Sequence, residues 1–592
     1  MKGTNILIKI LKKLKSRDWC FVVISIAFIV VQVWLDMTMP QYMKEITELI
    51  ETPGSEMSEV WKAGGMMLLC SLGSVAASVI TAVFAARIGS DLGFALRGDL
   101  FKKVQSFSME EIGKFSTASL ITRSTNDIQQ VLMFLIMGLQ MLIKAPITAV
   151  WAICKISGQE WQWSLATAIG VVIVLGVVGI CIALVLPKVK KMQKLTDDLN
   201  RVTRENLDGL RVVRAYNAEP YQENKFEQAN EQLTKTQLFQ QRTMAFMLPT
   251  MMIVQSGLML AVYWIGAALL GGVGTFDGRI TLFGNMMVFS QYGIMIVMSF
   301  MMLVMPFMML PRASVAAKRI NEVLDTVPAI HNGSALEGKD GLVGEVEFKN
   351  VSFRYPDAEE DVIHDISFTA KKGETVAFIG STGCGKSTVV NLVPRFYDAS
   401  DGEVLVDGLD VKEYDEHALR NKIAYVSQRA ILFSGTIASN VAYGDNGKPA
   451  PAEKEIADAI DTAQASEFVE SLPDKYDGFV AQGGTNFSGG QKQRLSIARA
   501  VARKAEIIIF DDSFSALDYK TDRALRKTLD EKCGGTTRLI VAQRIGTIRD
   551  ADKIIVLDEG RMVGIGKHEE LMQNCEVYRQ IALSQLSEEE LA

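Results

Sequence analysis

Six long apolar stretches constrain the fold of the first half of the chain. Each has about the 20 residues that an α-helix needs to cross a bilayer core roughly 30 Å thick. A helix also satisfies its own backbone hydrogen bonds, which hydrocarbon cannot do for it. The pattern predicts six membrane-spanning helices, with buried helices of a large soluble protein as the alternative. They are expected at residues 18–39, 61–86, 129–154, 163–187, 245–270 and 281–310.

Charged residues around these stretches predict which side of the membrane each end faces. Basic residues favour the cytoplasmic side. The loop after the first stretch is acidic, whereas residues 1–17 carry Lys2, Lys9, Lys12, Lys13, Lys15 and Arg17. Both termini are therefore expected in the cytoplasm. Apolar residues and lysines alternate at helical spacing within residues 1–17, which predicts a cytoplasmic elbow helix lying in the membrane interface.

The rest of the chain divides by composition. Two long charged loops, 87–128 and 188–244, contain almost no proline, so the membrane helices are expected to continue into the cytoplasm as stalks within a membrane domain spanning 18–326. Residues 327–340 are polar and predict a linker. Residues 341–592 begin with period-2 alternation, which predicts strands of a soluble domain. The net charge of −6 gives no basic field for nucleic acid.

The strongest chemical signal is a complete GxxxxGK[ST] phosphate-binding loop between an apolar strand-like segment and a helix-like one. Its glycines let backbone N–H groups surround phosphate oxygens at a helix N-terminus. Lys386 is expected to reach the β- and γ-phosphates of ATP, and Ser387 to bind Mg²⁺. The predicted ATP-binding residues of this segment are Gly380, Ser381, Thr382, Gly383, Cys384, Gly385, Lys386, Ser387 and Thr388.

A second apolar segment, Ile507–Phe510, predicts a strand that ends in Asp511. The carboxyl end of such a strand is where nucleotide-hydrolysing enzymes place a second carboxylate that organises Mg²⁺. An apolar strand that ends in an acidic residue is common in proteins and is weak evidence by itself. Behind a phosphate-binding loop at this separation, it indicates a Mg²⁺ site.

A glycine-rich segment between these two motifs resembles the LSGGQ signature of the ABC transporter family, with phenylalanine in place of the first leucine. A glycine turn that caps a helix is the structural alternative, but it explains only the glycines. In the family, two chains pair head to tail, so each ATP lies between one chain's phosphate loop and the other's signature. The residues expected to contact the partner's ATP are Phe487, Ser488, Gly489, Gly490 and Gln491.

The resemblance covers nearly the whole chain and is to the half-transporter arrangement of type IV exporters. It implies an α-helical six-span membrane domain fused to an α/β P-loop nucleotide-binding domain with a RecA-like core and a helical subdomain, in the inner or plasma membrane. Tyr355 matches the residue that stacks on adenine, and Gln428 matches a Mg²⁺-binding glutamine. Residues 119–128 and 206–220 resemble coupling loops. The loop that crosses between paired domains matches Ser515, Ala516, Leu517 and Asp518.

Two positions depart from the family pattern. Asp512 stands where hydrolysing members usually have the glutamate that polarises the attacking water, and its carboxylate sits roughly 1 Å back, a displacement that can cost about 10²-fold. Gln543 stands where the family has a switch histidine, and glutamine carries no proton or charge. Together the changes resemble the degenerate subunit of a heterodimeric multidrug-type exporter, whose partner chain has glutamate and histidine there. A slowly hydrolysing homodimer is the alternative.

The membrane half carries no clear substrate code. Methionines crowd the fifth and sixth stretches, which suits either a repacking binding surface or interhelical filler. Asp36 and Lys144 are the deepest charges and either contact substrate or pair with each other. A drug or lipophile exporter, a lipid or peptide translocator and a nucleotide-gated regulator all remain open, with membrane lipids and a small lipophilic substrate as the expected non-protein partners.

Overall fold

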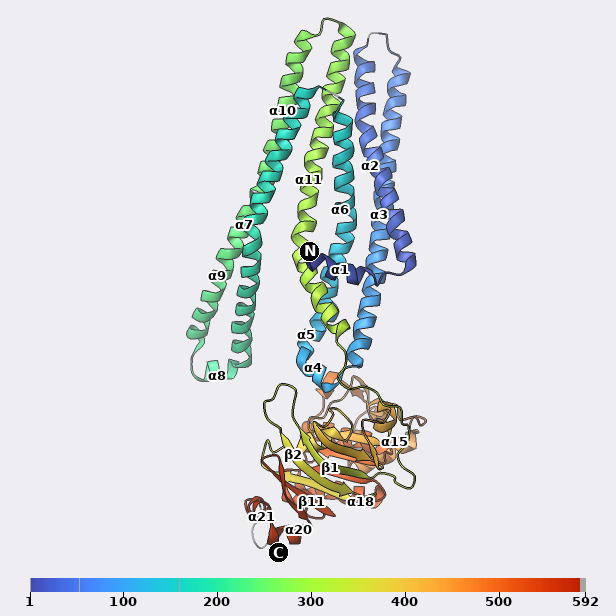
Figure 1. Cartoon of the computed structure of the whole chain (residues 1–592), viewed down its shortest axis with the longest axis vertical. Helices are drawn as coiled ribbons and strands as arrows, with labels where there is room; N and C mark the ends of the chain where they lie inside the picture. The colour runs from blue at the N-terminus through green and yellow to red at the C-terminus, as the bar shows by residue number, and fades with distance from the viewer. Residues whose placement is uncertain (1, 53, 159, 586–592) are drawn as a thin grey trace. The chain divides into compact units, whose positions relative to one another are not determined.

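The computed structural model describes residues 2–52, 54–158 and 160–585. The chain forms two compact units. Unit 1 comprises Met1–Gln105 with Ser116–Thr326, and unit 2 comprises Ser106–Phe115 with Val327–Ala592. The short segment 106–115, which lies inside the predicted membrane domain, thus packs with the nucleotide-binding part of the chain. Figure 1 shows the elements of both units.

Helices joined by short turns are the secondary structure of unit 1 among its described residues. Its elements are α1 Lys2–Leu11, α2 Ser16–Glu51, α3 Met57–Gln105, α5 Thr117–Thr122, the π-helical turn η1 Arg123–Asp127, α6 Ile128–Ile156, α7 Trp161–Asp208, α8 Leu210–Ala215, α9 Glu219–Ala245, α10 Met247–Gly272 and α11 Phe276–Asp325.

Six of the described helical stretches are long and apolar enough to cross a membrane, as predicted. Several continue far beyond their apolar parts. The helix of the second stretch runs to Gln105, and that of the fourth runs to Asp208. Helices α7 and α9 pack side by side and are joined through α8, as Figure 1 shows. These extensions match the stalks expected from the charged loops.

The surface of unit 1 is apolar along the spans. On α3 the side chains of Leu68, Leu72, Val79 and Val83 are all exposed. A soluble protein rarely leaves such a continuous apolar surface uncovered. The exposed side chains therefore fit contact with lipid, and the buried helices of a large soluble protein are excluded.

The two deepest charges of unit 1 pair with each other. Lys144 Nζ lies 3.2 Å from Asp36 Oδ2, and the Ser74 hydroxyl donates to Asp36 Oδ1 at 2.5 Å. These contacts join α6, α2 and α3. This ion pair explains how both charged residues are tolerated within the spans, with no contact to a substrate. Nearby on the sixth span, Asn285 accepts a hydrogen bond of 2.6 Å from Lys44 on α2.

Unit 2 is an α/β domain. Its helices are α4 Met109–Phe115, α12 Lys386–Leu392, α13 Glu416–Asn421, α14 Ile437–Val441, α15 Glu453–Thr462, α16 Ser466–Glu470, η2 Lys475–Asp477, η3 Gln482–Gly484, α17 Gly489–Ala502, α18 Tyr519–Lys532, α19 Ile545–Ile548, α20 His568–Asn574 and α21 Glu576–Leu583. Its strands are β1 Val346–Phe353, β2 Ile363–Ala370, β3 Thr375–Gly380, β4 Asp401–Val406, β5 Leu409–Asp410, β6 Ile423–Val426, β7 Gly435–Thr436, β8 Phe479–Val480, β9 Ile507–Asp511, β10 Thr537–Val541, β11 Lys553–Asp558 and β12 Arg561–Gly566.

The described strands of unit 2 form a main sheet in the order β12-β11-β3-β10-β9-β6, a four-stranded sheet β2-β1-β4-β5 and a small β7-β8 pair. The five strands from β11 to β6 run parallel. Parallel strands end at the same edge of a sheet, and ligands bind there in open α/β folds. The ends of β3, β6, β9 and β10 carry the motif residues.

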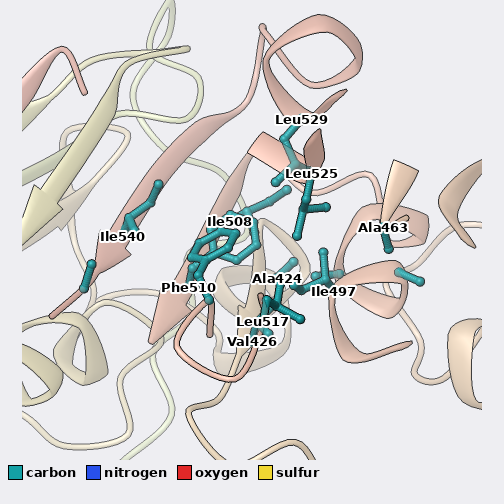
Figure 2. Packing of buried hydrophobic residues seen from close by; sticks show 14 of the residues in the cluster. Ala424, Val426, Ala463, Ile497, Ile508, Phe510, Leu517, Leu525, Leu529 and Ile540 are labelled. Atoms are coloured by element: carbon teal, nitrogen blue, oxygen red, sulfur yellow. The ribbon is translucent and has the colours of Figure 1, made fainter. Parts of the chain in front are cut away.

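The main sheet is buried on both faces, which explains why its strands are continuously apolar. On β9, Ile508 and Phe510 belong to a cluster that includes Leu525 of α18, whereas Ile507 and Ile509 belong to a second cluster shared with the four-stranded sheet. Figure 2 shows the first cluster, with Ile508, Phe510 and Ile540 on neighbouring strands. Dense packing on both faces fixes the strand ends.

The segment 106–115 is attached to unit 2 by a buried carboxylate. Glu111 of α4 accepts hydrogen bonds from the backbone and side chain of Ser108, and its Oε1 accepts one of 2.9 Å from the Ala329 N–H. Burial opposes the charge of Glu111, but the hydrogen bonds from Ser108 and Ala329 outweigh it and lower its pKa. Glu111 therefore stays ionised and fixes α4 to the start of unit 2.

Candidate nucleotide-binding site

The phosphate-binding loop joins the buried strand β3 to α12. Gly385 has φ of +94° and caps α12, and a Cβ there would meet the side chain of Ile363 at 2.6 Å. Only glycine fits such a position. Lys386 Nζ donates to the carbonyl oxygens of Gly380 at 2.9 Å and Ser381 at 2.7 Å. The ammonium group is therefore held over the loop, where it can bind phosphate oxygens instead.

Cys384 lies differently from its neighbours in this loop. Its side chain is 4% exposed and belongs to the core beneath the loop. Its Sγ lies 3.6 Å from Lys386 Nζ. The thiol therefore faces inward, so Cys384 can contribute only its backbone to a phosphate group.

Ser387 and Asp511 converge as a Mg²⁺ site requires. The Ser387 hydroxyl donates to Asp511 Oδ1 at 2.6 Å, although the two residues are far apart in the chain. A hydroxyl and a carboxylate are the oxygen ligands that Mg²⁺ takes beside nucleotide phosphates. The pair fits this cation, which would supply charge neutralisation for the phosphates when bound.

Sequence reasoning missed one residue at this carboxylate, Tyr425 on β6. Its hydroxyl lies 3.0 Å from Asp511 Oδ2 and 2.9 Å from Asn391 Oδ1 of α12. Burial, followed by the charge of Asp511, raises the pKa of Tyr425 far above its usual value. The phenol therefore keeps its proton and can donate a hydrogen bond to Asp511. A polar aromatic in an otherwise apolar strand, three residues before Gln428, was the available signal.

The two departures from the family pattern contact each other. Gln543 Nε2 donates to Asp512 Oδ2 at 2.7 Å, and Gln428 Nε2 donates to the same oxygen at 2.9 Å. Parallel pairing of β9 with β10 and β6 brings these three strand ends together. Asp512 itself has φ of +47°, a left-handed conformation that aspartate tolerates better than most residues. Because Gln428 bonds Asp512 through its Nε2, its Oε1 is the atom that could bind a cation.

The pKa of Asp512 is shifted. Burial raises its pKa, and the neighbouring charge of Asp511 adds to this, whereas hydrogen bonds from Gln428 and Gln543 and the charge of Lys386 act in the opposite direction. The net pKa lies above the usual range of an aspartate. A carboxylate with a raised pKa is a stronger base, which suits general-base catalysis if its geometry is right.

Tyr355 lies just after β1, beside the phosphate-binding loop. Its hydroxyl is 3.1 Å from Thr388 Oγ1. Its ring packs edge-on against Tyr397 at 5.3 Å and against Phe353 at 4.9 Å between centroids. The half-buried ring is thus fixed next to the loop, as an adenine-stacking residue would need to be.

The signature segment begins α17 with a capping box. Ser488 Oγ accepts from the Gln491 N–H at 3.3 Å, and Gln491 Oε1 accepts from the Ser488 N–H at 2.9 Å. Phe487 is buried against Phe468. A Cβ on Gly489 would meet no atom within 4 Å, so the chain's own packing does not require glycine there.

The residues 515–518 link the signature to Asp512. The Ser515 hydroxyl donates to the Asp512 carbonyl at 2.9 Å, and Asp518 caps α18 by accepting from the Thr521 N–H at 3.0 Å. The Ala516 carbonyl lies 3.3 Å from where a Cβ on Gly490 would be. This loop therefore contacts both motifs of its own chain.

Comparison with known proteins identifies the fold and the family. Residues 22–292 match the family model of the ABC transporter transmembrane region, and residues 363–515 match the family model described as ABC transporter. An uncharacterized ABC transporter ATP-binding protein of Mycobacterium bovis is 40% identical over 524 residues, covering 88% of this chain and 87% of that protein. The chain belongs to the ABC transporter family. Its fold class, a six-span helical domain with an ABC nucleotide-binding domain, is confirmed.

Two other similar proteins are a flippase and an exporter within this family. An ATP-dependent lipid A-core flippase of Pseudomonas fluorescens is 32% identical over 494 residues, covering 83% of this chain and 80% of the flippase. The structure of a bacterial Atm1-family ABC exporter with ATP bound has a TM-score of 0.80 and 23% identity, covering 96% of this chain and 99% of that one. The predicted resemblance to a type IV exporter half-transporter is confirmed for the family and the fold.

Proposed function

We propose that this ABC transporter chain is one subunit of an exporter that uses ATP to move lipophilic or amphiphilic molecules out across the cell membrane. The likeness to a lipid A-core flippase, over 83% of this chain and 80% of the flippase, supports a lipid-like substrate. The apolar, methionine-rich fifth and sixth spans are compatible with it. Cytoplasmic placement of both termini follows from the basic N-terminal residues.

ATP and Mg²⁺ are the proposed ligands of the chain's own site. The glycine loop and Lys386 would hold the phosphates, while Ser387 and Asp511 would hold the cation. Tyr355 would stack on adenine. Gln428 would join the Mg²⁺ ligands through its Oε1, the amide atom that does not bond Asp512.

One observation carries the proposal that this site hydrolyses ATP poorly. Asp512 Oδ2 already accepts hydrogen bonds from two glutamine amides, one of them from Gln543. The shorter carboxylate is thus held back among amides, and no histidine is present to bind the γ-phosphate with a charge. Because small misplacements of a catalytic group cost orders of magnitude in rate, slow hydrolysis is expected.

The signature segment supports the other half of the proposal. Its capping box is intact, and Gly489 leaves open space on its surface. Such a segment can bind the γ-phosphate at a partner's competent site. We therefore propose that this chain donates its signature to a second half-transporter with glutamate and histidine at the two departed positions.

A homodimer that hydrolyses ATP slowly at both sites is the second candidate. The raised pKa of Asp512 favours it, because the carboxylate is a stronger base than an ordinary aspartate. A nucleotide-gated regulatory subunit needs no hydrolysis at all, but it leaves the open signature surface unexplained.

Photolabelling can test the assignment. The assembled transporter is incubated with Mg²⁺ and an azido-ATP analogue radiolabelled in its base, then irradiated, and the nucleotide on each chain is analysed. We expect this chain to retain mainly triphosphate and the partner mainly diphosphate. Equal conversion on both chains, or assembly from this chain alone, would favour the homodimer.

A further inference from the structure

Unit 1 contains a cavity of about 460 Å³ that no part of the proposed ATP cycle uses. It lies among η1 and α6, α7, α9 and α11, and all of its lining residues belong to unit 1. Its volume is within the range of small-molecule sites, roughly 300–1,000 Å³. The cavity therefore has room for a ligand or for part of a larger one.

The cavity is apolar at one end and polar at the other. On α11 the apolar Phe307 and Met308 come first, and Arg312 and Arg319 follow one and three turns later towards the end of the helix. On α7, which runs in the same direction, the apolar Val185 likewise precedes the polar residues Thr196 and Asp197. On both helices the lining residues at the membrane end are apolar, and the charged and polar ones lie further towards the cytoplasmic end, where Val315 and Ala316 of α11 and Met192 of α7 also line the cavity.

A buried carboxylate lines the polar end. Asp127 is 4% exposed, and its Oδ2 accepts no hydrogen bond from any residue that the structure describes. The Arg319 guanidinium lies 3.9 Å from this oxygen, beyond hydrogen-bond distance. A buried carboxylate oxygen without a donor is costly, so a ligand with an N–H or O–H group would be stabilised there.

Asp127 also ends η1, a π-helical turn between α5 and α6. π-Turns are rare and frequently mark functional sites. The turn sets the position of Asp127 at the start of α6, beside the cavity.

Arg312 complements this carboxylate. It lines the same cavity, and its guanidinium has no ion pair or hydrogen bond within the described part of unit 1. A guanidinium binds phosphate or carboxylate groups with paired hydrogen bonds. The polar end therefore offers a binding group for an anion and another for a hydrogen-bond donor.

We propose that the cavity binds an amphiphile whose head group carries both a phosphate or carboxylate and an N–H or O–H donor. The anionic group contacts Arg312, the donor contacts Asp127, and the hydrocarbon tail lies against Phe307, Met308 and Val185. This inference rests on the proposed exporter function and adds the head-group chemistry and the place where the molecule binds.

Binding by the full-length chain in maltoside micelles tests the site without ATP or a partner. Native mass spectrometry measures the affinity for three probes: lysophosphatidylethanolamine, lysophosphatidylcholine and glycerophosphoethanolamine. The first has phosphate, donor and tail, the second lacks the donor, and the third lacks the tail. We expect the first to bind about tenfold more tightly than either of the others.

Variants assign that preference to residues. Arg312→Gln should weaken lysophosphatidylethanolamine binding about tenfold, whereas Arg312→Lys should retain most of it. Asp127→Asn should remove the preference over lysophosphatidylcholine. Lys318→Gln is the matched control, because Lys318 is an exposed cation on the same helix outside the cavity. Equal binding of the two lysolipids, or an equal loss in Lys318→Gln, would overturn the proposal.

The same probe separates this inference from the exporter function. ATP-driven movement of lysophosphatidylethanolamine is measured in proteoliposomes of the assembled transporter. Selective binding without ATP-driven movement would retain the site and reject the exporter. ATP-driven movement that Arg312→Gln and Asp127→Asn leave unchanged would retain the exporter and reject the site.

Discussion

The two neighbouring carboxylates Asp511 and Asp512 lie at one sheet edge in different surroundings. Asp511 accepts hydrogen bonds from the hydroxyl groups of Ser387 and Tyr425, one on each oxygen. Asp512 instead accepts two amide hydrogen bonds on a single oxygen, from Gln428 and Gln543. The first arrangement suits cation binding, and in the proposed function the second would hold back the residue that activates water.

This difference separates two tasks that one nucleotide site normally combines. In the proposed function, the binding half is formed by the phosphate loop and Asp511, which keep the family pattern. The hydrolytic half, formed by Asp512 and Gln543, has two substitutions in direct contact. A site of this kind can bind ATP tightly and still turn it over slowly.

The largest effect is expected from the binding half. Lys386→Ala removes the cation that lies over the loop, so MgATP affinity at this chain's site should fall by about 10²-fold. Lys372→Ala, at an exposed lysine before β3, is the control and should leave affinity unchanged. Fluorescent-nucleotide titration measures both. Unaltered affinity in Lys386→Ala would contradict ATP binding at this phosphate loop.

The raised pKa of Asp512 predicts the pH dependence of residual hydrolysis. An acid with a raised pKa takes up its proton at a higher pH, so the base form is lost earlier as pH falls. With the partner's catalytic glutamate changed to glutamine, the remaining rate should decline on the acidic side above the pH expected of an ordinary aspartate. Asp512→Asn should remove this decline along with most of the rate. A residual rate that keeps the same acidic limb in Asp512→Asn would show that Asp512 is not the base.

A smaller effect is expected from Tyr425→Phe. The change removes the hydroxyl beside Asp511 Oδ2 and keeps the ring. The Mg²⁺ concentration for half-maximal ATP binding should rise about three- to tenfold, with little change in affinity for metal-free ATP. Tyr443→Phe, at an exposed tyrosine, is the control. A purely structural role for Tyr425 would instead weaken binding with and without Mg²⁺ alike.

The smallest effect is expected at Cys384. Because its thiol is buried beneath the loop, maleimide should label Cys384 more slowly than Cys533, which is partly exposed in the same unit. In variants that keep one cysteine each, mass spectrometry gives both rates. Labelling of Cys384 as fast as Cys533, with protection by ATP, would place the thiol in the phosphate site.

The sequence allowed much of the fold and of the binding half to be predicted. The six apolar stretches and their charged flanks were enough to predict the spans and stalks, because a helix that crosses a membrane needs about 20 apolar residues. The phosphate loop and Asp511 could be placed together because parallel strands share an edge. Cys384 could not be placed in this way, since motif position does not say which way a loop side chain points.

Contacts between distant residues could not be predicted from local patterns. Tyr425 reaches Asp511 across two paired strands, and the contact between Gln543 and Asp512 depends on the same register. The pairing of Asp36 with Lys144 was one of two alternatives until the helices were placed. The cavity around Asp127 and Arg312 joins four helices and leaves no periodic signal in any one of them.

Restoring the two departed residues tests the central claim most directly. The assembled transporter carries the partner's catalytic glutamate changed to glutamine, so little hydrolysis remains. Asp512→Glu with Gln543→His is then introduced in this chain, and ATPase activity and thermal stability are measured. A correctly placed base contributes about 10²–10⁴-fold, so hydrolysis should return in part. An ordinary exporter rate from this chain alone as a homodimer, lost in Asp512→Asn, would contradict the account.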